Sequence, residues 1–362
     1  MKKNIILFML ICTAAFPLTG IRAAGGISRY VIAVGANNGG DQRERLRFAV
    51  SDAQAFVKIL NQMGGVSFDR TTVLVEPKRD SLKAELARIS NDIAEAKKFN
   101  PRIELIFYYS GHSNEDGLLL GKDTYPYKDL RASIEMIPAD VKIAVLDSCS
   151  SGAFTRIKGG KMLAPFMHDQ SQNMRGYAFM TSSSADEASQ ESDRIGGSFF
   201  THYLIAGLRG AADTGQDGRI TLNEAYQYAY RETLNRTERT AGGPQHPNYN
   251  IQMTGTGDVI LTDLRTGSSH LIIGENISGR IYINNGPVLL AVINKQKGTT
   301  VSLAVDEGVY SAVNDNEGIL SEMKFTVKKG TNFISVPFEI KSPKLWWCNG
   351  MGEAFLFYSS YL

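Results

Sequence analysis

Short, continuous apolar runs alternate with longer amphipathic segments over the first two thirds of the chain. The runs are rich in Val, Ile, Tyr and Phe, which is typical of parallel strands buried on both faces. They predict five strands, at 30–34, 72–75, 103–109, 141–146 and 177–181. The segments between them have apolar residues at helical spacing and predict helices at 52–63, 81–98, 127–134, 199–208 and 221–235. This alternation indicates an α/β domain with a mostly parallel sheet covered on both faces.

The pattern changes from about residue 267 onwards, where helical spacing gives way to short alternating runs separated by turn residues. Such runs stand at 280–283, 301–305, 324–327 and 333–336. Residues 265–341 therefore predict a small all-β sandwich, in which no cluster of His, Cys or carboxylates is suited to chemistry. The aromatic tail at 342–362 fits a final strand, a docking segment or the remnant of a longer C-terminal region.

The N-terminus has the order of a secretory signal peptide. Lys2 and Lys3 precede an apolar run from Ile5 to Phe16, and small residues follow from Ala23. We expect removal of residues 1–23 and a secreted or periplasmic mature protein; an uncleaved N-terminal anchor is the alternative. Because no other stretch approaches 18 apolar residues, we expect no membrane span after signal removal.

Charge narrows the classes of function. The 362 residues, enough for two domains, include 39 basic and 37 acidic side chains. Loss of the signal peptide leaves 36 basic residues, so the mature chain is nearly neutral. This balance argues against a nucleic-acid partner bound through a basic surface. Three cysteines are too few for a dense disulfide framework.

Two predicted strands end in small-residue turns that contain a histidine and a cysteine. Residues 103–109 are followed by Ser110-Gly111-His112-Ser113, and residues 141–146 by Asp147-Ser148-Cys149. The carboxyl ends of adjacent parallel strands meet at one edge of the sheet, and histidine is the usual base that activates a thiol. A lone cysteine is more often a core residue, and a lone histidine a hydrogen-bonded loop residue. The joint placement favours a nucleophile–base pair.

The stretches 109–113 and 147–152 resemble the two signatures of caspase-like cysteine peptidases, particularly metacaspases and bacterial caspase-family proteins. The resemblance covers about Arg29 to Leu264, within a domain at 24–264. It implies a three-layer α/β/α fold with a mostly parallel, six-stranded sheet, and peptide or protein substrates. It further implies that Cys149 attacks the scissile carbonyl to form a thioester and that His112 is the base and later the acid. The backbone N–H groups of Gly111 and Cys149 would hold the oxyanion.

The resemblance also suggests a specificity. Metacaspase-type relatives line the P1 pocket with carboxylates, and the matching positions are Asp52 and Asp147. Asp147 precedes the cysteine by two residues, so in an extended chain both side chains point to the same side. Carboxylates pair with Arg or Lys, so we expect cleavage after these residues. Asp52 has an alternative role as a helix cap. Asp186, beside Glu187, is a further pocket candidate in a loop that also fits a solvated acidic turn.

Residues 155–176 read as an exposed loop, and many relatives are cut there into two subunits. We therefore predict self-cleavage after one of the loop's basic residues, which are Arg156, Lys158, Lys161 and Arg175.

The stretch from Asp213 to Glu224 fits the spacing of a calcium-binding EF-hand loop, although Gly215 stands where a ligand is expected. The same residues fit a glycine turn followed by a capping box between Thr221 and Glu224, which we favour. We thus expect no metal and no other cofactor, with calcium as the alternative.

Two further interpretations compete with a caspase-like endopeptidase. One is an inactive scaffold of the same fold that acts through its β-domain on a protein or carbohydrate partner, which the sequence does not identify. The other is a legumain- or gingipain-like peptidase that differs in P1 choice. The intact pair of His112 and Cys149 favours an enzyme.

Overall fold

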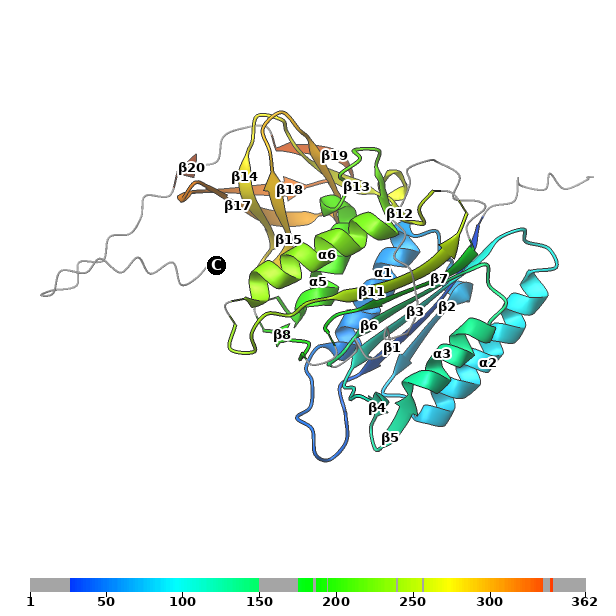
Figure 1. Ribbon diagram of the computed structural model, residues 1–362. Coiled ribbons are helices and arrows are strands. Elements are labelled where there is room, and N and C mark those ends of the chain that lie inside the picture. Colours follow the sequence, from blue (N-terminus) through cyan, green and yellow to red (C-terminus); the bar gives the residue numbers. More distant parts are fainter. Residues whose placement is uncertain are drawn as a thin grey trace, which may run out of the picture.

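The computed structural model describes most of the chain (Figure 1). The described residues are 27–149, 175–184, 187–193, 195–238, 240–255, 257–334 and, for the backbone, 339–340. The predictions for the signal peptide, for the tail at 342–362, and for Arg156, Lys158, Lys161 and Asp186 lie outside them. Among the helices that are described, none combines the length and apolar character needed to cross a membrane.

A six-stranded sheet forms the centre of the first part of the chain, in the order β11-β7-β6-β3-β1-β2. Its strands are β1 (Ser28–Ala36), β2 (Thr71–Val75), β3 (Ile103–Gly111), β6 (Val141–Asp147), β7 (Arg175–Thr181) and β11 (Asn248–Thr254). The first five run parallel, and β11 pairs antiparallel with β7 at the sheet edge. The five predicted strands and the mostly parallel, six-stranded sheet are confirmed.

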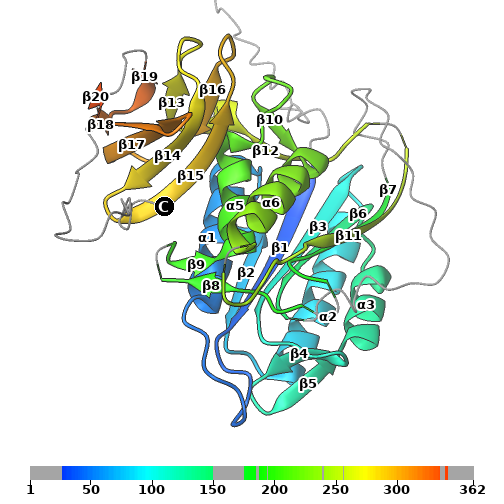
Figure 2. The ribbon, with the colours of Figure 1, turned by 60° about the vertical axis from the view of Figure 1, so that its left-hand side comes forward.

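Helices cover both faces of this sheet, as predicted (Figures 1 and 2). Alternate residues of β1 show why its run is wholly apolar. Val31 and Ala33 pack with α1 (Ala49–Met63), α5 (Phe199–Ala206) and α6 (Leu222–Thr237). Ile32 and Val34 pack on the opposite side with α2 (Arg79–Ala96) and α3 (Tyr127–Met136). Burial on both faces thus produces a continuous apolar strand.

Short strand pairs and single turns lie between the main strands and helices of the first part of the chain. They are the hairpin of β4 (Gly117–Leu120) and β5 (Asp123–Pro126), the pair of β8 (Glu191–Ser192) and β9 (Gly197–Ser198), and the pair of β10 (Arg219–Thr221) and β12 (Ile260–Asp263). Single turns are η1 (Phe68–Arg70), η3 (Gly207–Ala211), which continues α5, and η4 (Leu264–Thr266).

The remaining strands form an all-β unit, which we call the β unit. It contains β13 (Ser269–Ile273), β14 (Gly279–Asn285), β15 (Val288–Lys295), β16 (Val301–Ala304), β17 (Gly308–Asn316), β18 (Ile319–Val327), β19 (Gly330–Ile334) and β20 (Glu339–Ile340). Two sheets result, ordered β16-β13-β19 and β15-β14-β17-β18-β20. They share one apolar core, as the predicted sandwich requires.

The β unit packs directly on the α1, α5 and α6 side of the first part (Figure 2). One buried apolar cluster runs without interruption from the sheet through α5 into the β unit. Polar contacts reinforce it: the Tyr228 hydroxyl donates to the Val292 carbonyl, and Arg209 Nη1 donates to the Ala304 carbonyl at 3.3 Å. The β unit is therefore part of the wall around the first part's helices rather than a separate appendage.

Candidate active site

Two loops meet at the carboxyl ends of β3 and β6. The ladder pairs Ser110 with Asp147, and His112 and Cys149 each follow two residues later. The Ser113 hydroxyl donates to the Cys149 carbonyl, which links the loops directly. The structure thus brings the two predicted residues to neighbouring positions on one sheet edge.

His112 is held by the loop that follows β1. Its ring is buried, and its Nε2 lies 2.7 Å from the Glu44 carbonyl oxygen. A carbonyl only accepts, so Nε2 carries the proton and Nδ1 is left as the basic nitrogen. Gly39 is required beside the ring, because a Cβ there would lie 2.5 Å from His112 Cδ2. Burial lowers the pKa of His112, and the charge of Arg43 acts in the same direction.

Cys149 is a free, partly buried thiol. Its Sγ lies 3.9 Å from the Ser189 carbonyl oxygen. Burial raises the pKa of the Cys149 thiol and the charge of Asp147 raises it further, whereas Arg43 lowers it. Both shifts favour the uncharged forms of the thiol and the imidazole.

Asp52 and Asp147 lie together below these loops, both buried. Asp147 accepts hydrogen bonds from the Ser189 and Thr201 hydroxyls, each at 2.6 Å, and from the Ser198 hydroxyl. Asp52 accepts the Ser198 N–H at 3.0 Å. Ser198, the N-cap of α5, therefore touches both carboxylates.

The alternative role of Asp52 as a helix cap is wrong. Phe48 is the N-cap of α1, and no side chain caps it. Asp52 instead stands at the fourth helical position, and its carboxylate points to β9.

The two carboxylates form a site that favours a cation. Burial raises the pKa of Asp52 well above its usual range, and the neighbouring Asp147 charge adds to the shift. Their hydrogen-bond donors are hydroxyl and amide groups, and neither carboxylate has an ion pair with a lysine or arginine that the structure describes. Two buried acids without a cation are costly. A positively charged side chain entering between them would remove that cost.

A third carboxylate, Glu191, acts on both His112 and Asp52, and it is not identified from the sequence. Glu191 in β8 accepts the Arg47 N–H at 3.0 Å and the Phe48 N–H at 3.3 Å. It thus ties β8 to the start of α1, and its charge raises the pKa of both Asp52 and His112. Only the fold brings residue 191 next to residue 47, so no local motif could have signalled this contact.

Two other predicted residues, Glu187 and Arg175, lie in different surroundings. Glu187 accepts from the His246 N–H, and one of its oxygens lies 2.7 Å from His246 Nδ1. Arg175 is not in a loop: it is the first residue of β7 and pairs with Thr254 of β11. The predicted loop at 155–176 therefore ends earlier, because its last two residues belong to the sheet.

Gly111 is the last residue of β3 and pairs with Ala36 of β1. A Cβ at this position would lie 2.5 Å from the Tyr109 hydroxyl and 2.8 Å from the Ala36 carbonyl oxygen. Close packing is thus the physical reason for this glycine.

The turn at 213–224 contains the favoured capping box. Thr221 and Glu224 exchange side-chain and backbone hydrogen bonds at the start of α6. The other Glu224 oxygen accepts the Thr214 and Gly215 N–H groups, at 3.2 and 3.1 Å. Both carboxylate oxygens are therefore used within the turn. Over the described part of the chain, no group of three or more His, Cys, Asp or Glu side chains is arranged to hold a metal ion.

Comparison with known proteins gives the fold its family. A search of curated proteins finds no match for the chain. Among solved structures, caspase-1 from Spodoptera frugiperda is similar at 14% sequence identity with a TM-score of 0.46, over 67% of this chain and 94% of that one. The family model for the caspase domain matches residues 28–256, more than half of the chain. The chain therefore belongs to the caspase-domain family of cysteine peptidases.

Proposed function

We propose that this protein is a cysteine endopeptidase that cleaves after Arg or Lys through His112 and Cys149. The observation behind the proposal is the pair of buried carboxylates, Asp52 and Asp147, which lies beside the cysteine without a cation from the described residues. A P1 guanidinium or ammonium is the group that such a pocket accepts. The single carboxylate of a P1 Asp would be repelled by the two carboxylates of the pocket.

The dyad performs the chemistry in two halves. The Cys149 thiol gives its proton to His112 Nδ1 as Sγ attacks the scissile carbonyl, and the C–S bond forms while the carbonyl oxygen becomes an oxyanion. The tetrahedral species collapses, the C–N bond breaks, and His112 gives the proton to the leaving amine. Water, deprotonated by His112, then hydrolyses the thioester and regenerates the thiol.

Backbone groups support these steps. The Glu44 carbonyl, which accepts from Nε2, fixes the imidazole tautomer and stabilises the imidazolium that forms during attack. The Cys149 N–H is the proposed oxyanion donor. The Gly111 N–H, at the carboxyl end of β3, is the second proposed donor.

Three matched peptides that differ only in P1 test the proposal. Hydrolysis after Arg and Lys, with none after Asp, is the expected result. Cys149→Ala should abolish it, and labelling by an acyloxymethyl ketone with P1 Arg should depend on Cys149. Preference for P1 Asp would overturn the pocket assignment, and equal turnover by Cys149→Ala would overturn the nucleophile.

We also propose that the enzyme processes itself after Arg156, Lys158 or Lys161. Arg175 is less suited, because its backbone is paired within the sheet whereas a bound substrate must be free to extend into the site. Fragments that appear for the wild type but not for Cys149→Ala, located by mass spectrometry, would support this step.

We also propose that the protein is exported and that its activity needs no cofactor. N-terminal sequencing of the mature protein tests cleavage after residue 23 and secretion to the periplasm or beyond. Unchanged peptide hydrolysis in excess chelator is expected for a dyad that needs neither calcium nor another cofactor.

A further inference from the structure

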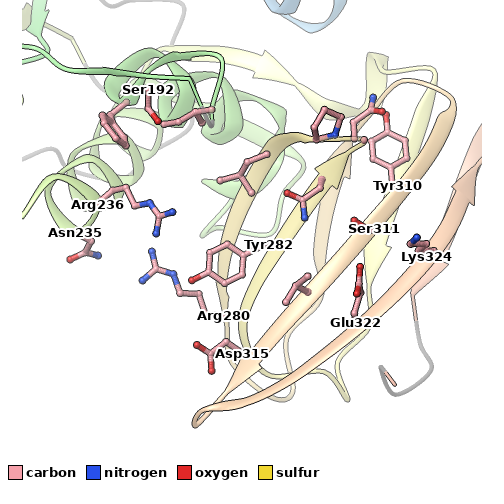
Figure 3. A pocket seen from close by; sticks show the side chains of 18 of the residues that line it. Ser192, Asn235, Arg236, Arg280, Tyr282, Tyr310, Ser311, Asp315, Glu322 and Lys324 are labelled. Carbon is pink, nitrogen blue, oxygen red and sulfur yellow. The ribbon is translucent and has the colours of Figure 1, made fainter. Parts of the chain in front are cut away.

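A groove of about 1430 Å³ separates the β unit from α6 and the β8–β9 pair (Figure 3). Ser192, Phe199 and Arg236 line one side, and Tyr282 and Tyr310 are among the residues of the β unit on the other. The volume exceeds the roughly 300–1,000 Å³ of a typical small-molecule pocket. A polypeptide segment is therefore a better match for its size than a metabolite.

The groove adjoins the candidate P1 pocket through consecutive residues. Ser192 lines the groove, whereas Glu191 beside it contacts the start of α1. Phe199 lines the groove, whereas Ser198 beside it contacts Asp52 and Asp147. The β8–β9 pair is thus a shared wall between the two sites. A protein substrate seated in the pocket has this groove within reach.

Two arginines face one another across the groove (Figure 3). Arg280 of β14 donates from Nη2 to Glu232 at 3.2 Å, and its buried Nε has no hydrogen-bond partner. Arg236 of α6 forms no ion pair or hydrogen bond with a side chain that the structure describes. Like charges facing one another repel, and an anion between them would reverse the sign of that interaction.

Two acids stand close to Arg280, and each also has other hydrogen-bond donors. Glu232 is fully buried and is already shared with Arg231 at 3.1 Å and with the Asn294 amide at 2.8 Å. Asp315 stands opposite Arg280 in the β14–β17 ladder, but its carboxylate accepts the Gly318 N–H at 3.1 Å in the turn that follows. The groove lining itself has three basic side chains, Arg236, Arg280 and Lys324, and three acidic ones, Glu238, Asp315 and Glu322, of which Arg236 and Arg280 face one another.

Aromatic and apolar groups continue from the arginines along the β-sheet wall. The Arg280 guanidinium lies over the Tyr282 ring, 5.7 Å from its centroid. Leu289, Val309 and Val313 also line the groove, and Val309 is 66% exposed. This combination matches a segment in which a carboxylate side chain stands beside apolar or aromatic residues.

We propose that the groove is an exosite that binds an acidic segment of protein substrates, with Arg236 and Arg280 holding its carboxylate. The proposal rests on the proposed function, since it extends the same substrate beyond P1. The preferred substrate then has two charged features: a basic residue at the cleaved bond and an acidic, partly apolar segment at a distance from it.

Matched peptides test the exosite. One is a short fluorogenic peptide with P1 Arg; the others add the same linker and either an acidic–aromatic or a basic–aromatic segment, on either side of the bond. We expect the acidic extension to lower KM about five- to tenfold in the wild type, as a charge-assisted contact at a partly exposed site can. Arg236→Glu should abolish that gain and leave kcat/KM for the short peptide unchanged.

Lys297→Glu is the matched control, an exposed lysine of the β unit outside the groove. It changes the net charge equally and should keep the gain. An acidic extension without effect on wild-type KM, or an equal loss for short and extended peptides in Arg236→Glu, would overturn the exosite.

Direct binding separates this proposal from the peptidase activity. Fluorescence anisotropy with Cys149→Ala should show the acidic–aromatic peptide binding more weakly as salt rises and about fivefold or more weakly with Arg236→Glu added. This result stands even if P1 Arg peptides are not cleaved. Absence of binding would overturn the exosite. A dimer in sedimentation that Arg236→Glu dissociates would show that a second copy of the chain occupies the groove instead.

Discussion

The molecule buries carboxylates in two places and treats them differently. Glu104, which is not exposed at all, lies between Arg29 and Arg102, which contact it at 2.5 and 2.7 Å. Asp52 and Asp147 are nearly as buried, yet their partners within the described part of the chain are hydroxyl and amide groups. The first site is electrically complete when the chain folds. The second has no counter-charge among the described residues, which is consistent with the binding pocket proposed above.

The positions of the two sites agree with this difference. Arg29 also donates to the carbonyls of Gly64, Leu261 and Ile260, so it joins β1 to the end of α1 and to β12. The Glu104 site thus holds together the amino-terminal edge of the sheet. Asp52 and Asp147 stand near the carboxyl edge, where α/β sheets bind their ligands.

Removal of the charge at the Glu104 site should have the largest effect on stability. Glu104→Gln removes the carboxylate that both buried arginines contact, and we expect a loss of about 3–5 kcal/mol in the free energy of unfolding. Urea denaturation measures it. The control Glu95→Gln removes an exposed pair with Lys98 and should cost less than about 0.5 kcal/mol. Similar small losses in both variants would mean that the Glu104 site is not structural.

The corresponding change in the pocket should affect specificity instead. With Asp147→Asn, kcat/KM for P1 Arg peptides should fall roughly 100- to 1,000-fold, because a buried guanidinium then lacks half of its counter-charge. Asparagine keeps hydrogen-bond acceptance from Ser189 or Thr201, so stability should change little. Hydrolysis of a matched peptide with a neutral P1 residue is the control. Equal losses for both peptides would place Asp147 in the chemistry rather than in recognition.

The two sites also differ in how far the sequence could predict them. Asp147 is predicted from the resemblance to metacaspase-type relatives, with its spacing to Cys149 as support, whereas β1, β3 and β6 follow from apolar runs that burial on both faces requires. The edge strand β11 alternates polar and apolar residues and is largely exposed on one side, so it gave only a weak signal. The Glu44 contribution is a backbone carbonyl, which no side-chain pattern can encode. Glu191 depends on a contact across 144 residues.

Substitution of Glu191 should have a smaller effect on activity, because its carboxylate influences Asp52 and His112 without being part of the proposed pocket. Glu191→Gln retains acceptors for Arg47 and Phe48 but removes a charge that raises the pKa of Asp52 and His112. Both pKa values should fall, so the acid limb of the kcat/KM profile should move to lower pH. We expect a loss of about two- to tenfold in kcat/KM for P1 Arg peptides at neutral pH.

The control for Glu191 is Asp193→Asn. Asp193 pairs with the exposed Arg47 guanidinium at 2.6 Å, so its removal should change the profile less. An acid limb that stays in place or moves to higher pH in Glu191→Gln would show that the charge at 191 does not act on the dyad and the pocket.

The smallest effect is the dependence of stability on pH, and it follows from the sign of the Asp52 shift. The pKa of Asp52 is raised in the folded state above its ordinary value of 3.8, so the folded protein binds this proton more tightly than the unfolded chain. The contribution of Asp52 to the free energy of unfolding therefore falls as pH rises from about 4 through the raised folded-state pKa. Asp52→Asn removes this contribution.

The difference between wild type and Asp52→Asn, measured by urea denaturation across that window, isolates Asp52 from other titrating groups. The variant should gain stability relative to the wild type as pH rises, whereas Asp80→Asn, at an exposed position, should show a flat difference. A tightly bound inhibitor with P1 Arg should abolish the wild-type slope, because its guanidinium favours the ionised carboxylate. If the slope persists with the inhibitor bound, the P1 cation does not enter between Asp52 and Asp147. The pocket assignment would then be wrong.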